Sequence, residues 1–360
     1  MNQIKNQPAP LEFKPDLADA ARRWEAYLAG EILDRPLVMV RAPKPGKKTA
    51  PGSTYRDRAF GDLDPIIDNA LLNAEATFYG GEAIPSFWLS FGPDEIAVFC
   101  GSELVWPEDK AIDTNWSKPW VEDWAAALPL KIHEDHPLWR RMIDFYRRAA
   151  ARMAGKMLLS HIDLHSNMDI LAPIRGAERL CMDLIDKPEM IDRAMASARA
   201  LFPKIWRTFA EAGRMDERGY CFGLYSMDGT ATLQCDFSCM VSPAMFRRWI
   251  LPALEEEASI VKHAYYHWDG PGALKFFDDL MAAKDLHTFS YVPNPNQIHL
   301  HCLDLFQRIQ AAGKSVHFWG SAEEIKQAHP HLRPEKTMYS CGVGTPAEAE
   351  ALLEWFVKHT

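Results

Sequence analysis

The sequence predicts an α/β protein with a parallel sheet and helices packed outside it. From about residue 150 onward, short apolar runs alternate with helical stretches. The runs are continuously apolar rather than alternating in polarity, which is typical of strands buried on both faces of a parallel sheet. Right-handed crossovers between such strands place the helices on the outside.

Each expected element has its own local signal. A helix over 18–32 leads into the apolar run 37–40. Further helices are expected to open at Pro188 and continue to Gly213, at Ser242-Pro243 with a kink at Pro252, and at Thr345-Pro346, where Glu348 completes capping-box spacing. The expected strands are 156–165, 220–227, 263–269, 286–293, 315–320 and 336–343.

Composition limits the class of protein. The chain has 360 residues, of which 48% are hydrophobic and 25% charged, and this excludes a disordered protein. The absence of a long apolar segment and of a signal-peptide core predicts a cytoplasmic protein without a membrane partner. A net charge of −9 argues against a nucleic-acid partner. Seven cysteines without a CxxC pair are expected to be reduced thiols.

Polar and sulfur residues gather where the expected strands end. In a closed (β/α)₈ barrel these ends meet at one mouth, which holds the active site. The candidates are Asp163, His165, Tyr225, Asp228, His267, Asp269, Tyr291, Asn294, Trp319 and Cys341.

Three of these residues suggest a metal site. His267 and Asp269 are two positions apart, so on a strand they point to the same side. Cys341 ends a later strand, and the three together would leave one position of a zinc ion open, as in catalytic zinc sites. A hydrogen-bonded histidine beside an ordinary core cysteine is the alternative, and whether Cys235 joins the site stays open.

Several stretches resemble a known family. They are HSNMDILAPIRGAERLCMDLIDKPEMID, LQCDFSCMVSPAMF, YYHWDGPGALKFFDDLM and YSCGVGTPAEAEALL. They resemble the uroporphyrinogen decarboxylase superfamily, which includes zinc-dependent corrinoid methyltransferases. The resemblance is good over residues 155–360 and loose before them. It implies one (β/α)₈ TIM barrel domain over 1–360, with residues 1–35 as an N-terminal helical extension.

One residue departs from the methyltransferase pattern. That pattern holds zinc with a His-x-Cys pair and a later Cys before a Thr-Pro helix start. His267 and Cys341 match it, whereas Asp269 stands where the pair's Cys belongs. A carboxylate leaves zinc a stronger Lewis acid than a thiolate does, which favours demethylation of an oxygen or nitrogen donor.

The resemblance implies a methyl transfer between a small O- or N-methylated substrate and a corrinoid. The corrinoid would be supplied by a partner protein, because the chain lacks an Asp-x-His-x-x-Gly signature. Residues expected to bind substrate are His165, Asp228, Tyr291, Asn294 and Trp319.

Two alternatives remain open. One is a metal-independent decarboxylase of a polycarboxylate that uses Asp163, Tyr225 and His267, although the Arg-Gln-Ala-Gly-Arg motif of that branch is absent. The other is a non-catalytic barrel that binds a small molecule. A homo-oligomer is possible, and the sequence does not determine the oligomeric state.

Overall fold

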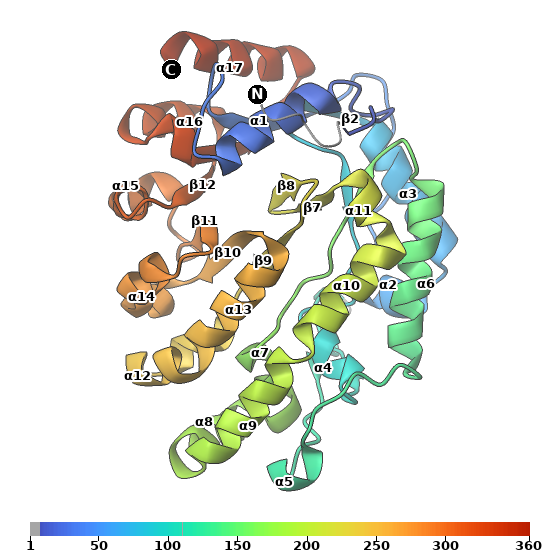
Figure 1. Cartoon of the computed structure of the whole chain (residues 1–360). Coiled ribbons are helices and arrows are strands. Elements are labelled where there is room, and N and C mark those ends of the chain that lie inside the picture. Colours follow the sequence, from blue (N-terminus) through green and yellow to red (C-terminus); the bar gives the residue numbers. More distant parts are fainter. Residues whose placement is uncertain (1–7, 110) are drawn as a thin grey trace.

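The computed structural model describes residues 8–109 and 111–360, which form a mixed α/β fold around a mostly parallel sheet (Figure 1). The main sheet has seven strands in the order β2-β1-β13-β12-β11-β10-β9. All neighbours in it are parallel except β1 and β2. The strands are β1 (Leu37–Pro43), β2 (Thr77–Gly81), β9 (Thr230–Leu233), β10 (His263–Asp269), β11 (Leu286–Val292), β12 (Ser315–Trp319) and β13 (Thr337–Gly342).

The fold is barrel-like, but its hydrogen bonds do not close one ring within the described residues. A second parallel pair, β3 (Ser86–Trp88) and β6 (Leu158–Ser160), is separate from the main sheet. The antiparallel strand β2 occupies the edge of β1, so β1 cannot pair there with β3. The structure thus confirms the α/β, barrel-like part of the expected (β/α)₈ barrel and shows no closed ring of strands among the described residues. The remaining strands form the antiparallel pairs β4 (Leu104–Val105) with β5 (Trp116–Ser117) and β7 (Tyr220–Phe222) with β8 (Leu224–Ser226).

Helices surround the strands and share a large apolar core with their outer faces. The helices of the first half are α1 (Leu17–Leu28), α2 (Tyr55–Phe60), α3 (Leu63–Glu75), α4 (Glu95–Phe99), α5 (Trp124–Ala127), α6 (Pro137–Arg152), α7 (Met168–Arg175), α8 (Ala177–Asp186) and α9 (Pro188–Arg199). Those of the second half are α10 (Phe202–Gly213), α11 (Met215–Arg218), α12 (Pro243–Met245), α13 (Leu251–Val261), α14 (Phe277–Ala282), α15 (Leu303–Ala311), α16 (Ala322–Ala328) and α17 (Pro346–His359).

Proline positions explain where the expected helices change. The helix that Pro188 opens ends at Arg199, and α10 begins at Phe202, with Pro203 in its first turn. The expected single helix to Gly213 is therefore two helices. The helix capped by Ser242 passes through a π-helical segment, Phe246–Ile250, before α13. The kink expected at Pro252 thus takes the form of a wider turn just before that residue.

A smaller inner core lies at the N-terminal ends of the strands, where α1 covers them. Trp24 and Tyr27 of α1 pack there with Leu37 and Leu158, which start β1 and β6. The indole of Trp24 donates to the carbonyl of Glu82 at 3.2 Å. Helix α1 therefore closes the end of the fold opposite to the C-terminal strand ends.

One glycine reverses a segment that the sequence presented as a single strand. Gly223 has a φ of +76° and turns the expected strand 220–227 into the antiparallel hairpin β7–β8. A Cβ at Gly223 would lie 2.6 Å from the Tyr265 ring, so the turn requires glycine. As a result β8 runs back toward α1.

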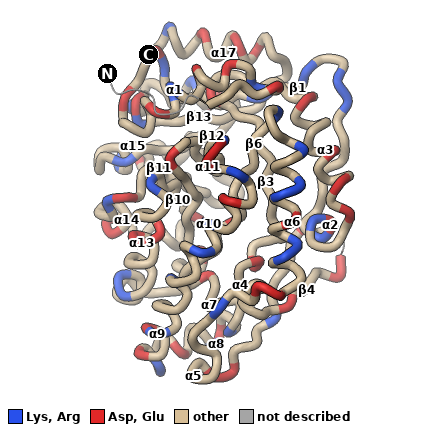
Figure 2. Tube along the Cα trace, turned by 45° about the vertical axis from the view of Figure 1, so that its right-hand side comes forward, with Lys and Arg blue, Asp and Glu red and all other residues tan. Residues whose placement is uncertain are grey.

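The outer surface carries both signs of charge. Figure 2 shows Lys and Arg segments interspersed with Asp and Glu segments over the outer helices in that view. None of the helices within the described residues combines the length and apolar content that crossing a bilayer requires.

Candidate functional site

The strongest cluster of polar groups lies at the C-terminal ends of the strands. Asp163 and His165 follow β6, and Asp236 follows β9. His267 and Asp269 lie on the last part of β10, on the same side as Tyr265, which belongs to the inner core. Polar groups of three separate elements therefore converge on the inner side of the fold.

His165 is the centre of this cluster. Its Nε2 lies 3.3 Å from an Asp163 oxygen, and its Nδ1 lies 3.6 Å from Asp169 and 4.0 Å from Asp236. Both ring nitrogens thus face carboxylates, and only a doubly protonated imidazolium offers a proton to each side.

Other donors hold these carboxylates in place. The side-chain amide of Gln234 donates to Asp163 at 2.8 Å. Asp169, in the first turn of α7, accepts from the backbone N–H groups of Asp236 and Phe237 at 2.8 and 2.9 Å. The positions of both carboxylates are therefore set by donors other than His165.

Protonation follows from these contacts. Burial alone would lower the pKa of His165, but hydrogen bonds to Asp163 and Asp169 and their charges raise it well above its usual value. Burial raises the pKa of Asp163, while the hydrogen bond and charge of His165 outweigh that effect and lower it. Burial and the charge of Asp169 raise the pKa of Asp236 to about 7. The cluster thus holds a cation beside a carboxyl group that titrates near neutrality.

His267 differs from His165 in its protonation. Burial lowers its pKa, and the charges of Asp269 and Asp163 oppose this only in part. His267 is therefore a neutral imidazole at pH 7, able to accept a hydrogen bond or to act as a ligand.

Cys341 does not join His267 and Asp269. It lies on β13, three strands from β10, and packs with the outer core. Its neighbour Ser340 faces inward and contacts His317, so alternation along the strand turns Cys341 outward. Burial raises the pKa of its thiol to about 11. In the part of the chain that the structure describes, no three His, Cys, Asp or Glu side chains are grouped so that they could hold a metal ion.

Cys235 lies beside the cluster as a thiol. Its Sγ is 3.6 Å from Asp169, and burial raises the pKa of the thiol well above its usual value.

Two other expected site residues lie at the opposite end of the fold. Tyr225 and Asp228 line a cavity with Trp24 of α1 and with His263, the first residue of β10. The hairpin that begins at Gly223 carries them there. They therefore lie away from His165, and their expected roles in catalysis and substrate binding stay predictions for this cavity.

The side chains of the three remaining substrate-binding candidates lie in different parts of the fold. Tyr291 is buried edge-on against Trp268 on the outer side of the sheet, away from the His165 cluster. Its expected substrate contact stays a prediction. Asn294 lies in the exposed turn after β11. Trp319 ends β12 on the same side as His317, at 5.6 Å between ring centres.

An inner cavity of about 300 Å³ adjoins the strands. Trp24, Trp88 and Phe222 supply aromatic walls, and Arg41 and His317 are among its polar lining residues. His317 bonds to the Tyr265 hydroxyl at 2.6 Å and to the Ser340 hydroxyl at 2.7 Å. Burial lowers the pKa of His317 to about 3, so its ring is neutral.

Sequence reasoning missed the residues that organise the cluster. Gln234 and Asp236 follow β9, a strand that was not expected. Asp169 carries a weak sequence signal as an acidic residue in the first turn of α7, but its partners are backbone groups that are distant in sequence. Only the fold shows that these groups meet.

Solved structures with a similar fold include a methyltransferase. A methyltransferase from Methanosarcina mazei aligns with a TM-score of 0.61 over 94% of this chain and 98% of that chain, at 13% sequence identity. At this identity the likeness shows the fold alone. No protein-family model and no curated protein sequence matches the chain.

Proposed function

We propose that this chain is a methyltransferase that moves a methyl group from a small O- or N-methylated substrate to a corrinoid carried by a partner protein. The observation that supports it most is the cationic His165, held by two carboxylates at the C-terminal strand ends. The fold shared with the methyltransferase from Methanosarcina mazei supports the same class of reaction.

The chemistry of demethylation explains why such a cation is useful. When a heteroatom loses its methyl group, it keeps the bonding electrons and becomes basic, so it requires a proton. His165 would supply this proton, and Asp163 and Asp169 would hold the imidazolium in position before the step. A reduced corrinoid supplies the nucleophile that accepts the methyl group.

The proposed proton transfer does not depend on zinc. His267 and Asp269 offer two donors on the inner side, but the third expected ligand, Cys341, lies on the outer side of β13. The expected His267–Asp269–Cys341 set therefore does not fit a zinc ion. We expect Cys341→Ser to leave both metal content and activity unchanged, whereas loss of bound zinc and of activity together would restore the metal hypothesis.

A donor panel tests the proposed function. Purified protein would be incubated with Co(I) cobalamin and methoxy-aromatic, methylamine or betaine donors, and methyl-Co(III) would be followed by its absorbance. We expect turnover with at least one donor class. Release of CO₂ from a carboxylic acid without methyl transfer would favour the decarboxylase instead, and silence in both assays would favour a binding protein.

A further inference from the structure

A buried arginine near the His165 cluster has no anionic partner. Arg58 of α2 is 8% exposed, and its Nε has no hydrogen-bond partner. Its guanidinium carbon lies 4.7 Å from the centre of the Tyr55 ring and 5.8 Å from that of Trp88. Among the residues that the structure describes, no carboxylate lies within ion-pairing distance of it.

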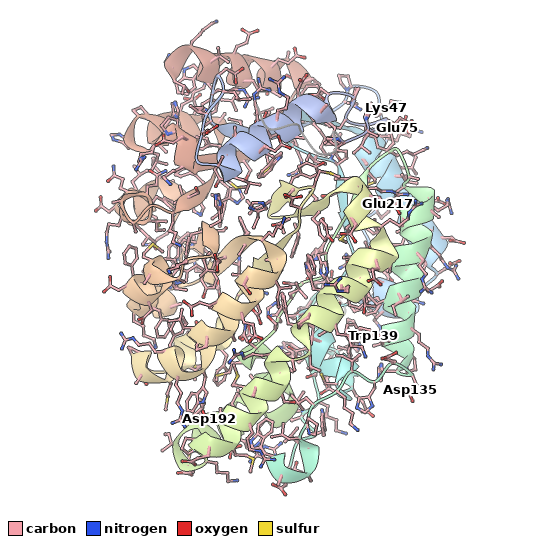
Figure 3. All side chains as sticks on the ribbon, viewed as in Figure 1. Lys47, Glu75, Asp135, Trp139, Asp192 and Glu217 are labelled. Atoms are coloured by element: carbon pink, nitrogen blue, oxygen red, sulfur yellow. The ribbon has the colours of Figure 1, made fainter. Side chains whose placement is uncertain are left out.

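Other arginines of the chain show what Arg58 lacks. Arg248 binds the exposed Asp192 through two nitrogens, at 3.0 and 2.7 Å, and Figure 3 labels Asp192 on α9. The buried Arg175 donates to Asp183 at 2.6 Å. A buried cation is most stable beside an anion, and Arg58 contacts the Tyr55 and Trp88 rings but no carboxylate.

Two further polar atoms near Arg58 also lack partners. They are the indole nitrogen of Trp88 and Oε1 of Glu95, both buried. Burial raises the pKa of Glu95 to about 8, so at pH 7 this side chain carries a proton. With its Oε2 accepting from Phe91 N at 2.7 Å, the other oxygen is free to donate. Arg58, Trp88 and protonated Glu95 are therefore all donors, a set that suits an anion.

The position of these donors relates them to the proposed reaction. Trp88 is the last residue of β3 and so lies at a C-terminal strand end. The guanidinium of Arg58 lies over its ring, and the charge of Glu95 acts on Arg58, so the three residues are neighbours. The charges of Asp163 and His165 both act on Glu95. Trp88 also stacks on Phe222 at 6.0 Å and lines the inner cavity of about 300 Å³.

We propose that Arg58, Trp88 and Glu95 bind the carboxylate of an aromatic acid whose ring lies along Trp88 toward the inner cavity. The aromatic walls favour a flat ring, and the guanidinium can donate two parallel hydrogen bonds to the oxygens of a carboxylate. This proposal names the substrate class of the proposed methyltransferase, a methoxy-aromatic acid, and in that respect rests on the proposed function.

Calorimetric titration with benzoate and with its neutral analogue benzamide tests the site without any methyl transfer. We expect wild-type protein to bind benzoate roughly tenfold or more tightly than benzamide. Arg58→Gln should abolish this preference while leaving benzamide binding. Arg56→Gln is the matched control, because Arg56 lies two residues away on the same helix and is exposed. Its preference should equal that of wild type.

Other outcomes overturn the site. Equal affinity for the two probes, no binding of either, or an undiminished preference in Arg58→Gln would each do so. If Arg58→Gln fails to fold, as judged by circular dichroism, Arg58→Lys replaces it and should show a reduced preference. A benzoate preference without turnover of any methyl donor would refute the proposed function and leave the carboxylate site intact. Turnover of a methyl donor without a preference for benzoate would refute the carboxylate site and leave the proposed function intact.

Discussion

His165 differs from other buried histidines of this chain in what surrounds it. Burial lowers the pKa values of His161 and His287 to about 4, and both rings are neutral at pH 7. At His165 two carboxylates outweigh the same effect. A buried histidine kept in its charged form at a strand end is a candidate for proton transfer rather than for packing.

Replacing His165 tests this role directly. His165→Gln keeps a side chain of similar size but removes the acidic proton, so methyl transfer should fall by roughly 10² to 10⁴ in kcat. The measurement is initial rate at saturating donor, with unfolding followed in parallel. His301→Gln, at an exposed position, is the control. A fully active and folded His165→Gln protein would show that the cation has no part in the reaction.

Glu95, in the same region, should make the stability of the fold depend on pH. Its pKa is raised from near 4.5 to about 8 in the folded state, so the folded protein binds this proton more tightly than the unfolded chain does. Its burial is therefore least costly below pH 4.5, and stability is lost progressively as pH rises toward 8. Above that pH the ionised group remains destabilising.

We expect Glu95→Gln to gain stability over wild type as pH increases. The difference in unfolding free energy should grow by a few kcal/mol between pH 5 and pH 8.5. Urea unfolding at both pH values measures this difference, and Glu350→Gln, at an exposed position of α17, controls for the loss of one carboxylate. A difference that is constant with pH would mean that Glu95 ionises normally.

At the scale of elements, the β7–β8 hairpin shows how one turn redirects two candidate residues. Gly223 and Gly46 both have positive φ, +76° and +73°. A Cβ at Gly223 would meet Tyr265 at 2.6 Å, whereas nothing lies within 4 Å at Gly46. A side chain at Gly46 would therefore cause backbone strain alone, whereas one at Gly223 would cause backbone strain and a steric clash.

Replacing each glycine with alanine should lower the unfolding free energy by a different amount. Gly46→Ala should cost about 1 kcal/mol from backbone strain alone, and Gly223→Ala should cost about 2 kcal/mol more because Tyr265 must move. Chemical denaturation of both variants measures the difference. Equal losses of unfolding free energy in the two variants would indicate that the hairpin and Tyr265 adjust to the added methyl group without a steric cost.

At the scale of the whole molecule, α1 joins the N-terminal segment to the inner core. Trp24 is 2% exposed and lines both the cavity beside Tyr225 and the inner cavity. It therefore separates the two spaces. The N- and C-terminal helices lie together at one end of the molecule, at the top of Figure 1.

Removing this side chain should destabilise the whole fold. Trp24→Ala deletes a large buried indole and should cost about 3–5 kcal/mol, with a single cooperative transition if α1 and the strands unfold together. Trp120→Ala, at a residue 37% exposed, should cost much less. An early, separate transition for Trp24→Ala would instead show that α1 folds apart from the rest.

Local pattern alone determined the later strands. The apolar runs predicted β10 to β13 within one or two residues, because continuous apolar sequence between polar turns suits buried parallel strands. The alternation of side chains was also sufficient to place His267 and Asp269 on one side of β10. These features depend only on neighbours along the chain.

Tertiary structure alone decided which residues meet. The reversal at Gly223 moved Tyr225 and Asp228 to the far end, and the inward direction of Ser340 turned Cys341 outward. His165 acquires its charge from Asp169, and Asp169 is held by backbone groups near Asp236. Burial, pairing and charge depend on contacts between distant segments. The sequence of any one segment does not contain them.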